Sequence, residues 1–181
     1  MGECFRALDE TTKELSDKIF RTYGQNAKHY LRKSWAHLCN AFLLEAKWFA
    51  NNHLPAPEEY LKNRTVSSGA YILLVHLFFL KGENMTSSSI DDLTDYSQGM
   101  SNSVATIFRL CDDLGSAKDE NQEGDCFMNE HKNATRERAR KCVKLMISDA
   151  WERRNTECLT SSAYSTTLRK SVLNSAREWF N

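Results

Sequence analysis

Apolar residues recur at steps of three and four along most of the chain, which is the spacing of one face of an α-helix. The pattern predicts a first helix over about 4–22, a long second helix ending before Asn51, a short helix beginning near Pro57, an apolar helix over 70–80, and helices over about 99–120, 134–157 and 162–180. Gly, Asn and Pro residues separate these segments. No repeat or linker divides the chain, so the pattern predicts one all-α domain over residues 1–181.

The apolar faces also predict which residues form the core. In the first helix the stripe runs through Phe5, Leu8, Leu15, Ile19 and Phe20. The helix over 70–80 is apolar all round and is expected near the centre of a bundle, with His76 as a hydrogen-bonded core residue and no metal ligand. The aromatic side chains expected first of all in the core, where some could instead line an apolar cavity, are Trp35, Trp48, Phe49, Tyr71, Phe78 and Phe79.

Composition narrows the classes of partner. The chain has 24 Lys and Arg against 24 Asp and Glu, so no basic field exists to attract nucleic acid. No apolar run is long enough to span a bilayer, and the N-terminus does not have the pattern of a signal peptide. The six cysteines include no Cys-x-x-Cys pair, which indicates reduced thiols on helices and a reducing compartment.

The candidate chemistry lies in the run from Asp112 to Glu120. Asp112, Ser116 and Glu120 are spaced four apart, so on a helix they share one face and direct three oxygen ligands to one place. Such hard ligands suit Mg²⁺, which substrate phosphates commonly complete. Arg109 lies one turn upstream, where its guanidinium could hold a phosphate. Because Asp112 follows an apolar stretch, we expect it in buried surroundings, where a carboxylate requires a cation or hydrogen bonds to compensate its burial; the alternative is a solvated acidic helix end.

A second acidic run, residues 91–95, has the form of an aspartate-rich metal motif. It follows a Ser-rich segment, and residues 87–92 have the composition of a helix cap and first turn. We therefore predict a structural role for this run and no metal site.

Longer motifs are distributed over nearly the whole chain. They are Leu31-Arg32-Lys33-Ser34-Trp35, Leu43-Leu44-Glu45-Ala46-Lys47-Trp48, Glu59-Tyr60-Leu61, the run from Arg109 to Ser116, and Ile147-Ser148-Asp149-Ala150-Trp151. Together these segments resemble the plant class I terpene synthases, in the C-terminal half of their catalytic α-domain. The residues from Asp112 onward most resemble synthases of the linalool and nerolidol type.

The resemblance implies a terpenoid synthase helical bundle and Mg²⁺-dependent ionisation of a prenyl diphosphate, such as geranyl or farnesyl diphosphate, with Mn²⁺ as an alternative ion. The product implied is a mono- or sesquiterpene, in particular an acyclic alcohol. Asp112, Ser116 and Glu120 fall on the family's second metal motif, and Arg109 on its diphosphate-binding arginine. Ser67-Ser68-Gly69 falls on the helix break that faces the carbocation.

The chain also departs from the family pattern. The family's first, aspartate-rich metal wall lies upstream of the segment where this chain begins, and the run at Asp91, only 21 residues before Asp112, cannot replace it. The segment after Glu120 is short, and the chain ends at Asn181, before the family's final helix. These departures predict a partial domain with impaired or absent activity on its own. They also predict an exposed apolar face through which it associates.

Two other functions remain open at this point. The chain could be a non-catalytic helical remnant, or a helical interaction module without metal chemistry. For the compartment, we expect the cytoplasm or a plastid, with the N-terminal targeting region absent from this chain.

Overall fold

The computed structural model describes residues 2–82, 85–94, 99–119 and 136–160, together with Lys170 and Asn174. Within these ranges every regular element is helical, which confirms the all-α prediction. The helices are α1 (Gly2–Tyr23), α2 (Lys28–Ala50), α3 (Pro57–Ser67), α4 (Ala70–Lys81), α5 (Ser87–Thr94), α6 (Gly99–Asp119) and α8 (Arg136–Thr160).

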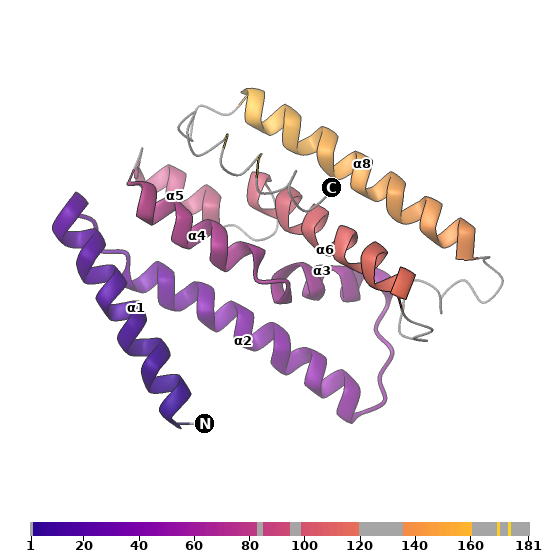
Figure 1. The fold of residues 1–181 in the computed structure, drawn as a ribbon, viewed down its shortest axis with the longest axis horizontal. Coiled ribbons are helices and arrows are strands. Elements are labelled where there is room, and N and C mark those ends of the chain that lie inside the picture. Colours follow the sequence, from indigo (N-terminus) through magenta and orange to yellow (C-terminus); the bar gives the residue numbers. More distant parts are fainter. Residues whose placement is uncertain are drawn as a thin grey trace.

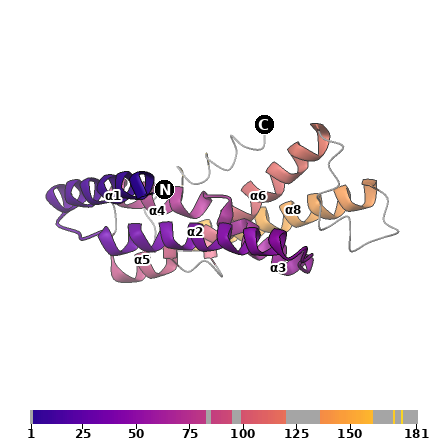
Figure 2. The ribbon, with the colours of Figure 1, turned by 90° about the horizontal axis from the view of Figure 1, so that it is seen from below.

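The helices form a flattened assembly in which α4 and α6 occupy the middle. Figure 1 shows α1 and α2 along one side and α8 along the other. In the edge-on view, α1 lies beside one end of α2, and α2 extends on toward α3 (Figure 2). α3 and α4 each pack against both α2 and α6, while α8 packs chiefly on α6. The junction between α3 and α4 therefore lies between the helix that carries Asp112 and the long helix α2.

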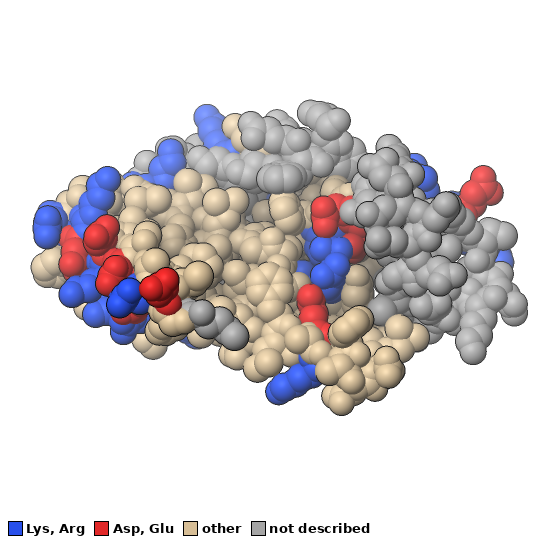
Figure 3. Space-filling model, turned by 60° about the horizontal axis from the view of Figure 1, so that its bottom comes forward, with Lys and Arg blue, Asp and Glu red and all other residues tan. Residues whose placement is uncertain are grey.

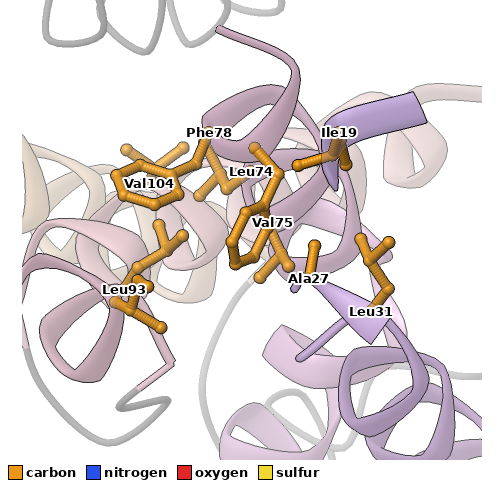
Figure 4. Packing of buried hydrophobic residues seen from close by; sticks show 10 residues of the cluster. Ile19, Ala27, Leu31, Leu74, Val75, Phe78, Leu93 and Val104 are labelled. Atoms are coloured by element: carbon orange, nitrogen blue, oxygen red, sulfur yellow. The ribbon is translucent and has the colours of Figure 1, made fainter. Parts of the chain in front are cut away.

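The core is built around α4. Phe78 and Phe79 are each 1% exposed and meet edge to face with their ring centres 5.4 Å apart. Figure 4 shows side chains from several helices converging on this position. Its buried members are Ile19, Ala27, Leu31, Leu74, Val75, Phe78, Phe79, Ile90, Leu93 and Val104. The prediction that the apolar helix lies near the centre of the bundle is confirmed. The hydrogen bond expected of His76 is confirmed, because its Nδ1 lies 2.7 Å from the carbonyl oxygen of Ile72, although the residue is only partly buried.

Several residues predicted to lie in the core are exposed. Phe5 and Phe20 of α1 are 72% and 57% exposed, so only part of the predicted stripe is buried. On α2, Phe49 is 87% exposed, and Phe42 and Leu43 are about half exposed. The reason is that α2 packs on α1, α3 and α4, and no other described helix covers these side chains. Periodicity identified the apolar face correctly, but the prediction that Phe49 is a core residue was wrong for the described structure.

The Ser-rich segment before the second acidic run starts a helix, as predicted, but the first turn of this helix holds no acidic residue and Asp91 lies in its second half. Residues 87–94 form α5, and Thr86 is its cap, since Thr86 Oγ1 accepts a hydrogen bond from the backbone N–H of Ser89 at 3.2 Å. Asp91 is exposed, whereas Leu93 is 2% exposed and joins the core.

The helix predicted over 162–180 falls outside the described residues except for Lys170 and Asn174, which are helical. None of the helices in the described part of the chain has both the length and the apolar character needed to cross a lipid bilayer.

Candidate functional site

The candidate ligands lie at the C-terminal end of α6. Because α6 continues to Asp119, Asp112 and Ser116 lie one turn apart on the same helix face, as predicted. The side chain of Ser116 and the whole of Glu120 lie outside the described residues. Within the described ranges, no three His, Cys, Asp or Glu side chains come together to hold a metal ion. The three-ligand site therefore stays a prediction.

Arg109 is held between two carboxylates one turn further along α6. Its Nη1 lies 3.0 Å from Oδ2 of Asp112, and its Nη2 donates to Oδ1 of Asp113. The Arg109 side chain is 11% exposed, and its buried Nε has no hydrogen-bond partner among the described residues. A buried donor without a partner is costly, so an acceptor that reached this guanidinium would be bound favourably. This arrangement, next to an exposed carboxylate, fits an oxyanion held beside a divalent cation.

The two aspartates are placed differently from the prediction. Asp112 was expected in buried surroundings, but its side chain is 55% exposed. Asp113 is the more buried of the two, at 17% exposed. Adjacent helix positions point about 100° apart, so Asp113 faces the packed side and Asp112 the open side. The burial argument for a cation at Asp112 was wrong, although an exposed carboxylate remains able to bind one.

Cys111 sits among these charged residues but does not join their chemistry. It is half-buried, and burial raises the pKa of its thiol above the ordinary value. The thiol therefore stays protonated at neutral pH and is a poor metal ligand or nucleophile.

The second predicted feature is the helix break between α3 and α4. α3 ends at Ser67, Gly69 has a left-handed backbone with φ of +78°, and α4 begins at Ala70. Ser68 bridges the break: its Oγ donates to the carbonyl of Thr65 at 2.7 Å and accepts from the N–H of Ala70 at 3.3 Å. The break at Ser67, Ser68 and Gly69 is confirmed. Their contact with a substrate stays a prediction.

The backbone at Gly69 gives a first testable prediction. Replacing Gly69 with Ala should lower the free energy of unfolding by about 1–2 kcal/mol, because an L-residue resists the left-handed conformation. A Cβ there would meet nothing within 4 Å, so backbone strain is the whole effect. Urea denaturation measures this change in unfolding free energy. The control is Gly2→Ala in α1, because Gly2 does not have a positive φ and an added Cβ there also meets nothing within 4 Å. Equal stability of Gly69→Ala and the wild type would contradict this account.

The sequence analysis missed a polar cluster that joins α2 to α3. Glu45 on α2 accepts hydrogen bonds from Ser67 Oγ at 2.5 Å and from Asn63 Nδ2 at 3.3 Å, and its Oε2 lies 3.3 Å from Nη1 of Arg64. The signal was the spacing of Asn63, Arg64 and Ser67, which places three donors on one helix face. Without the tertiary packing, nothing identified Glu45 as their acceptor.

Tyr60 connects this cluster to α6. Its hydroxyl accepts a hydrogen bond from Nε of Arg64 at 3.1 Å. Burial, and next the negative charge of Asp113, raise the pKa of Tyr60, while Arg64 and Arg109 act in the opposite direction. Figure 3 shows one group of acidic and basic side chains set within the otherwise uncharged middle of a face. Charges on α2, α3 and α6 therefore influence one another.

The raised pKa of Tyr60 predicts a change of stability in alkaline solution. The unfolded chain loses this proton near the usual tyrosine pKa of about 10, and the folded chain loses it at higher pH. The stabilising contribution is therefore complete below about pH 10 and falls as pH rises through the folded pKa. Tyr60→Phe removes it. The difference in unfolding free energy between wild type and Tyr60→Phe should stay constant up to about pH 10 and shrink as the pH rises above it; a difference that stays constant at higher pH would contradict the assignment.

Arg154 is a second feature that the sequence did not indicate. This residue of α8 is 0% exposed, and its guanidinium carbon lies 3.8 Å from the ring centre of Trp151, a cation–π contact. Its Nη2 donates to Oδ1 of Asn155 at 3.4 Å. Many charged residues surround it in sequence, so its burial could not be read from composition.

The comparisons with known proteins agree with these observations. Residues 1–153 match the terpene synthase family, metal binding domain. The chain is 48% identical to the chloroplastic S-(+)-linalool synthase of Arabidopsis thaliana, over 98% of this chain and 32% of that protein. It is 45% identical to an (E)-nerolidol synthase of Cannabis sativa, over 98% of this chain and 33% of that protein.

A solved structure extends the likeness to three dimensions. Isoprene synthase from leaves of grey poplar (Populus x canescens), in complex with three Mg²⁺ ions and dimethylallyl-S-thiolodiphosphate, superposes with a TM-score of 0.89 at 33% identity, over 98% of this chain and 34% of that one. The chain thus spans about a third of the length of these relatives. The matched domain and the shared bundle lead to one conclusion: the chain belongs to the terpene synthase family, in its metal-binding domain.

Proposed function

We propose that this chain supplies one metal-binding wall and the diphosphate-binding arginine of a terpene synthase. The observation that carries the proposal is Arg109, whose nearly buried guanidinium lies beside Asp112 and has one donor that pairs with none of the described residues. A guanidinium in this state is suited to an oxyanion with several acceptor atoms. A diphosphate is such an anion.

Each residue of the candidate site has a distinct role in this proposal. Asp112, Ser116 and Glu120 hold Mg²⁺, for which Mn²⁺ is an alternative, through carboxylate and hydroxyl oxygens. Bound Mg²⁺ supplies positive charge that stabilises the departing diphosphate. Arg109 holds the diphosphate, and Asp113 keeps Arg109 in place. Ser67, Ser68 and Gly69 form part of the wall around the hydrocarbon, where exclusion of water protects an allylic cation.

The substrate we propose is a prenyl diphosphate, geranyl or farnesyl diphosphate, and the product an acyclic terpene alcohol. Support comes from the names of two relatives, a linalool synthase and a nerolidol synthase, at 48% and 45% identity. The linalool synthase is named as chloroplastic, which supports a plastid as the compartment of this chain. The other compartment we propose is the cytoplasm. Because the chain matches about a third of these proteins, we expect it to bind diphosphate with little or no turnover alone.

A second candidate function is a non-catalytic helical unit that binds a partner. The observation that favours it is the exposure of large apolar side chains on α1 and α2, among them Phe5 at 72% and Phe49 at 87%. Apolar surface of this kind commonly marks an interaction site.

A chimera tests the proposed function. Residues 1–181 replace the matching third of the Arabidopsis linalool synthase, and the purified protein is incubated with geranyl or farnesyl diphosphate and Mg²⁺. We expect volatile terpenes, and their loss in the Asp112→Ala chimera. Two results together would support the non-catalytic alternative. They are a folded chimera that forms no terpene, and a 181-residue chain that shows no Mg²⁺-dependent binding of diphosphate.

A further inference from the structure

We infer that Glu45 on α2 is a positioning residue that holds the α3–α4 junction in place and thereby sets the fit of the substrate's hydrocarbon chain. The inference rests on the proposed function. It assigns a role to a carboxylate that lies outside the predicted metal and diphosphate residues and on a different helix.

The first support is the concentration of donors on one carboxylate. Ser67 Oγ donates to Oε1 of Glu45 at 2.5 Å, the length of a strong charge-assisted hydrogen bond. Asn63 Nδ2 donates to the same oxygen at 3.3 Å and to the carbonyl of Ala41 at 3.1 Å. Arg64 meets the other oxygen at 3.3 Å. Glu45 is 23% exposed, so these contacts are partly shielded from water and exceed an ordinary surface ion pair in strength.

The second support is where these donors lie. Ser67 is the last residue of α3 and lies two residues before Gly69, whose backbone turns the chain into α4. A Cβ at Gly69 would meet no atom of the described residues within 4 Å, so Gly69 itself is not packed by a described side chain. The junction is held instead by contacts on either side of it. On the α4 side, Tyr71 donates to Asn102 Oδ1 on α6 at 3.0 Å and joins a buried cluster with Ala105. On the α3 side, the bond from Ser67 to Glu45 ties the last residue of the helix to α2.

The third support is the connection from Glu45 to α6. Arg64 binds Glu45 and also donates to the hydroxyl of Tyr60, which senses the charges of Asp113 and Arg109. The same arginine therefore lies between the carboxylate that holds the junction and the residues around Arg109. In the proposed enzyme the junction faces the hydrocarbon and Arg109 the diphosphate. Glu45 then fixes the distance between the two halves of one substrate.

The test compares Glu45→Gln with Glu59→Gln, an exposed glutamate on α3, in the 181-residue chain. Gln keeps the shape of the side chain but removes the charge that Ser67 and Arg64 recognise. Isothermal titration in Mg²⁺ uses two probes, inorganic diphosphate and the thiolodiphosphate analogue of geranyl diphosphate. For Glu45→Gln we expect about tenfold weaker binding of the prenyl probe, the effect of one lost charge-assisted bond. Inorganic diphosphate should bind within about twofold of wild type, a negligible free-energy change.

A loss of affinity for the prenyl probe but not for inorganic diphosphate distinguishes a positioning role from general damage to the fold. Equal weakening of both probes, or no difference from Glu59→Gln, would overturn the inference. If Glu45→Gln fails to fold, Ser67→Ala removes only the hydroxyl that Glu45 accepts from, and the same split is expected.

Hydrogen exchange of the ligand-free chain separates this inference from the proposed function. In Glu45→Gln the amides of residues 68–73 should exchange faster than in wild type, and in Glu59→Gln they should not. If wild type binds neither probe, the proposed function fails, and exchange at the junction then decides whether Glu45 holds it. Unchanged exchange in Glu45→Gln would overturn the positioning role directly.

Discussion

Replacing Arg109 with Gln is expected to weaken binding of diphosphate in Mg²⁺ by roughly 10- to 150-fold. The guanidinium lies beside Asp112, is only 11% exposed and has a buried Nε that pairs with no residue in the described part of the chain, which suits it to bind an oxyanion. A hydrogen bond to a charged group contributes about 1.5–3 kcal/mol, which gives the stated range. Isothermal titration with inorganic diphosphate measures the change.

The matched control is Arg153→Gln, an exposed arginine on α8, for which binding should stay within about twofold of wild type. Mg²⁺ without diphosphate provides a second control, because Arg109 pairs with Asp112 at 3.0 Å in the ligand-free chain. Removing the arginine frees that carboxylate, so affinity for Mg²⁺ alone should not fall. Equal losses in Arg109→Gln and Arg153→Gln would rule out a specific role for Arg109.

Replacing Phe78 with Ala is expected to lower the free energy of unfolding by about 3–5 kcal/mol. Phe78 is 1% exposed in the middle of α4 and packs edge to face on Phe79. Truncation removes this buried ring and leaves a cavity that the surrounding helices cannot fill completely. Since domains of this size are stable by only about 5–15 kcal/mol, the loss is a large share of the total.

Leu73→Ala is the control for this substitution, since Leu73 lies on the same helix but is 54% exposed. We expect a change of about 0.5 kcal/mol or less there, as at most surface positions. Guanidinium denaturation monitored by circular dichroism gives both values. Similar losses for the two variants would show that α4 is not the centre of the core.

Helix positions followed from the sequence because the determining contacts are local. The apolar run of α4 and the Ser-Ser-Gly break before it depend on residues within one or two turns. What covers a helix face is not local. The stripe containing Phe20 and the face containing Phe49 were found by periodicity, yet their exposure depends on which helices pack beside α1 and α2.

The candidate site likewise combines features that local sequence predicts with features that depend on tertiary packing. Arg109, Asp112 and Ser116 were placed on one helix by their spacing, and the structure keeps them there. Which aspartate would be buried could not be predicted, because Asp112 and Asp113 are both within reach of Arg109 at three and four residues. Glu45 meets Ser67 across 22 residues of sequence, and only the packing of α2 on α3 joins them.

In the proposed function, Asp112 belongs to a Mg²⁺-dependent diphosphate site. The most direct measurement is isothermal titration of the 181-residue chain with inorganic diphosphate, with and without Mg²⁺, for wild type, Asp112→Ala and Asp91→Ala. Asp91, an exposed residue of α5, is the control from the other acidic run. We predict binding in Mg²⁺ for wild type and Asp91→Ala, and its loss without Mg²⁺ or in Asp112→Ala. Binding that does not require Mg²⁺, or that persists in Asp112→Ala, would contradict this assignment of Asp112.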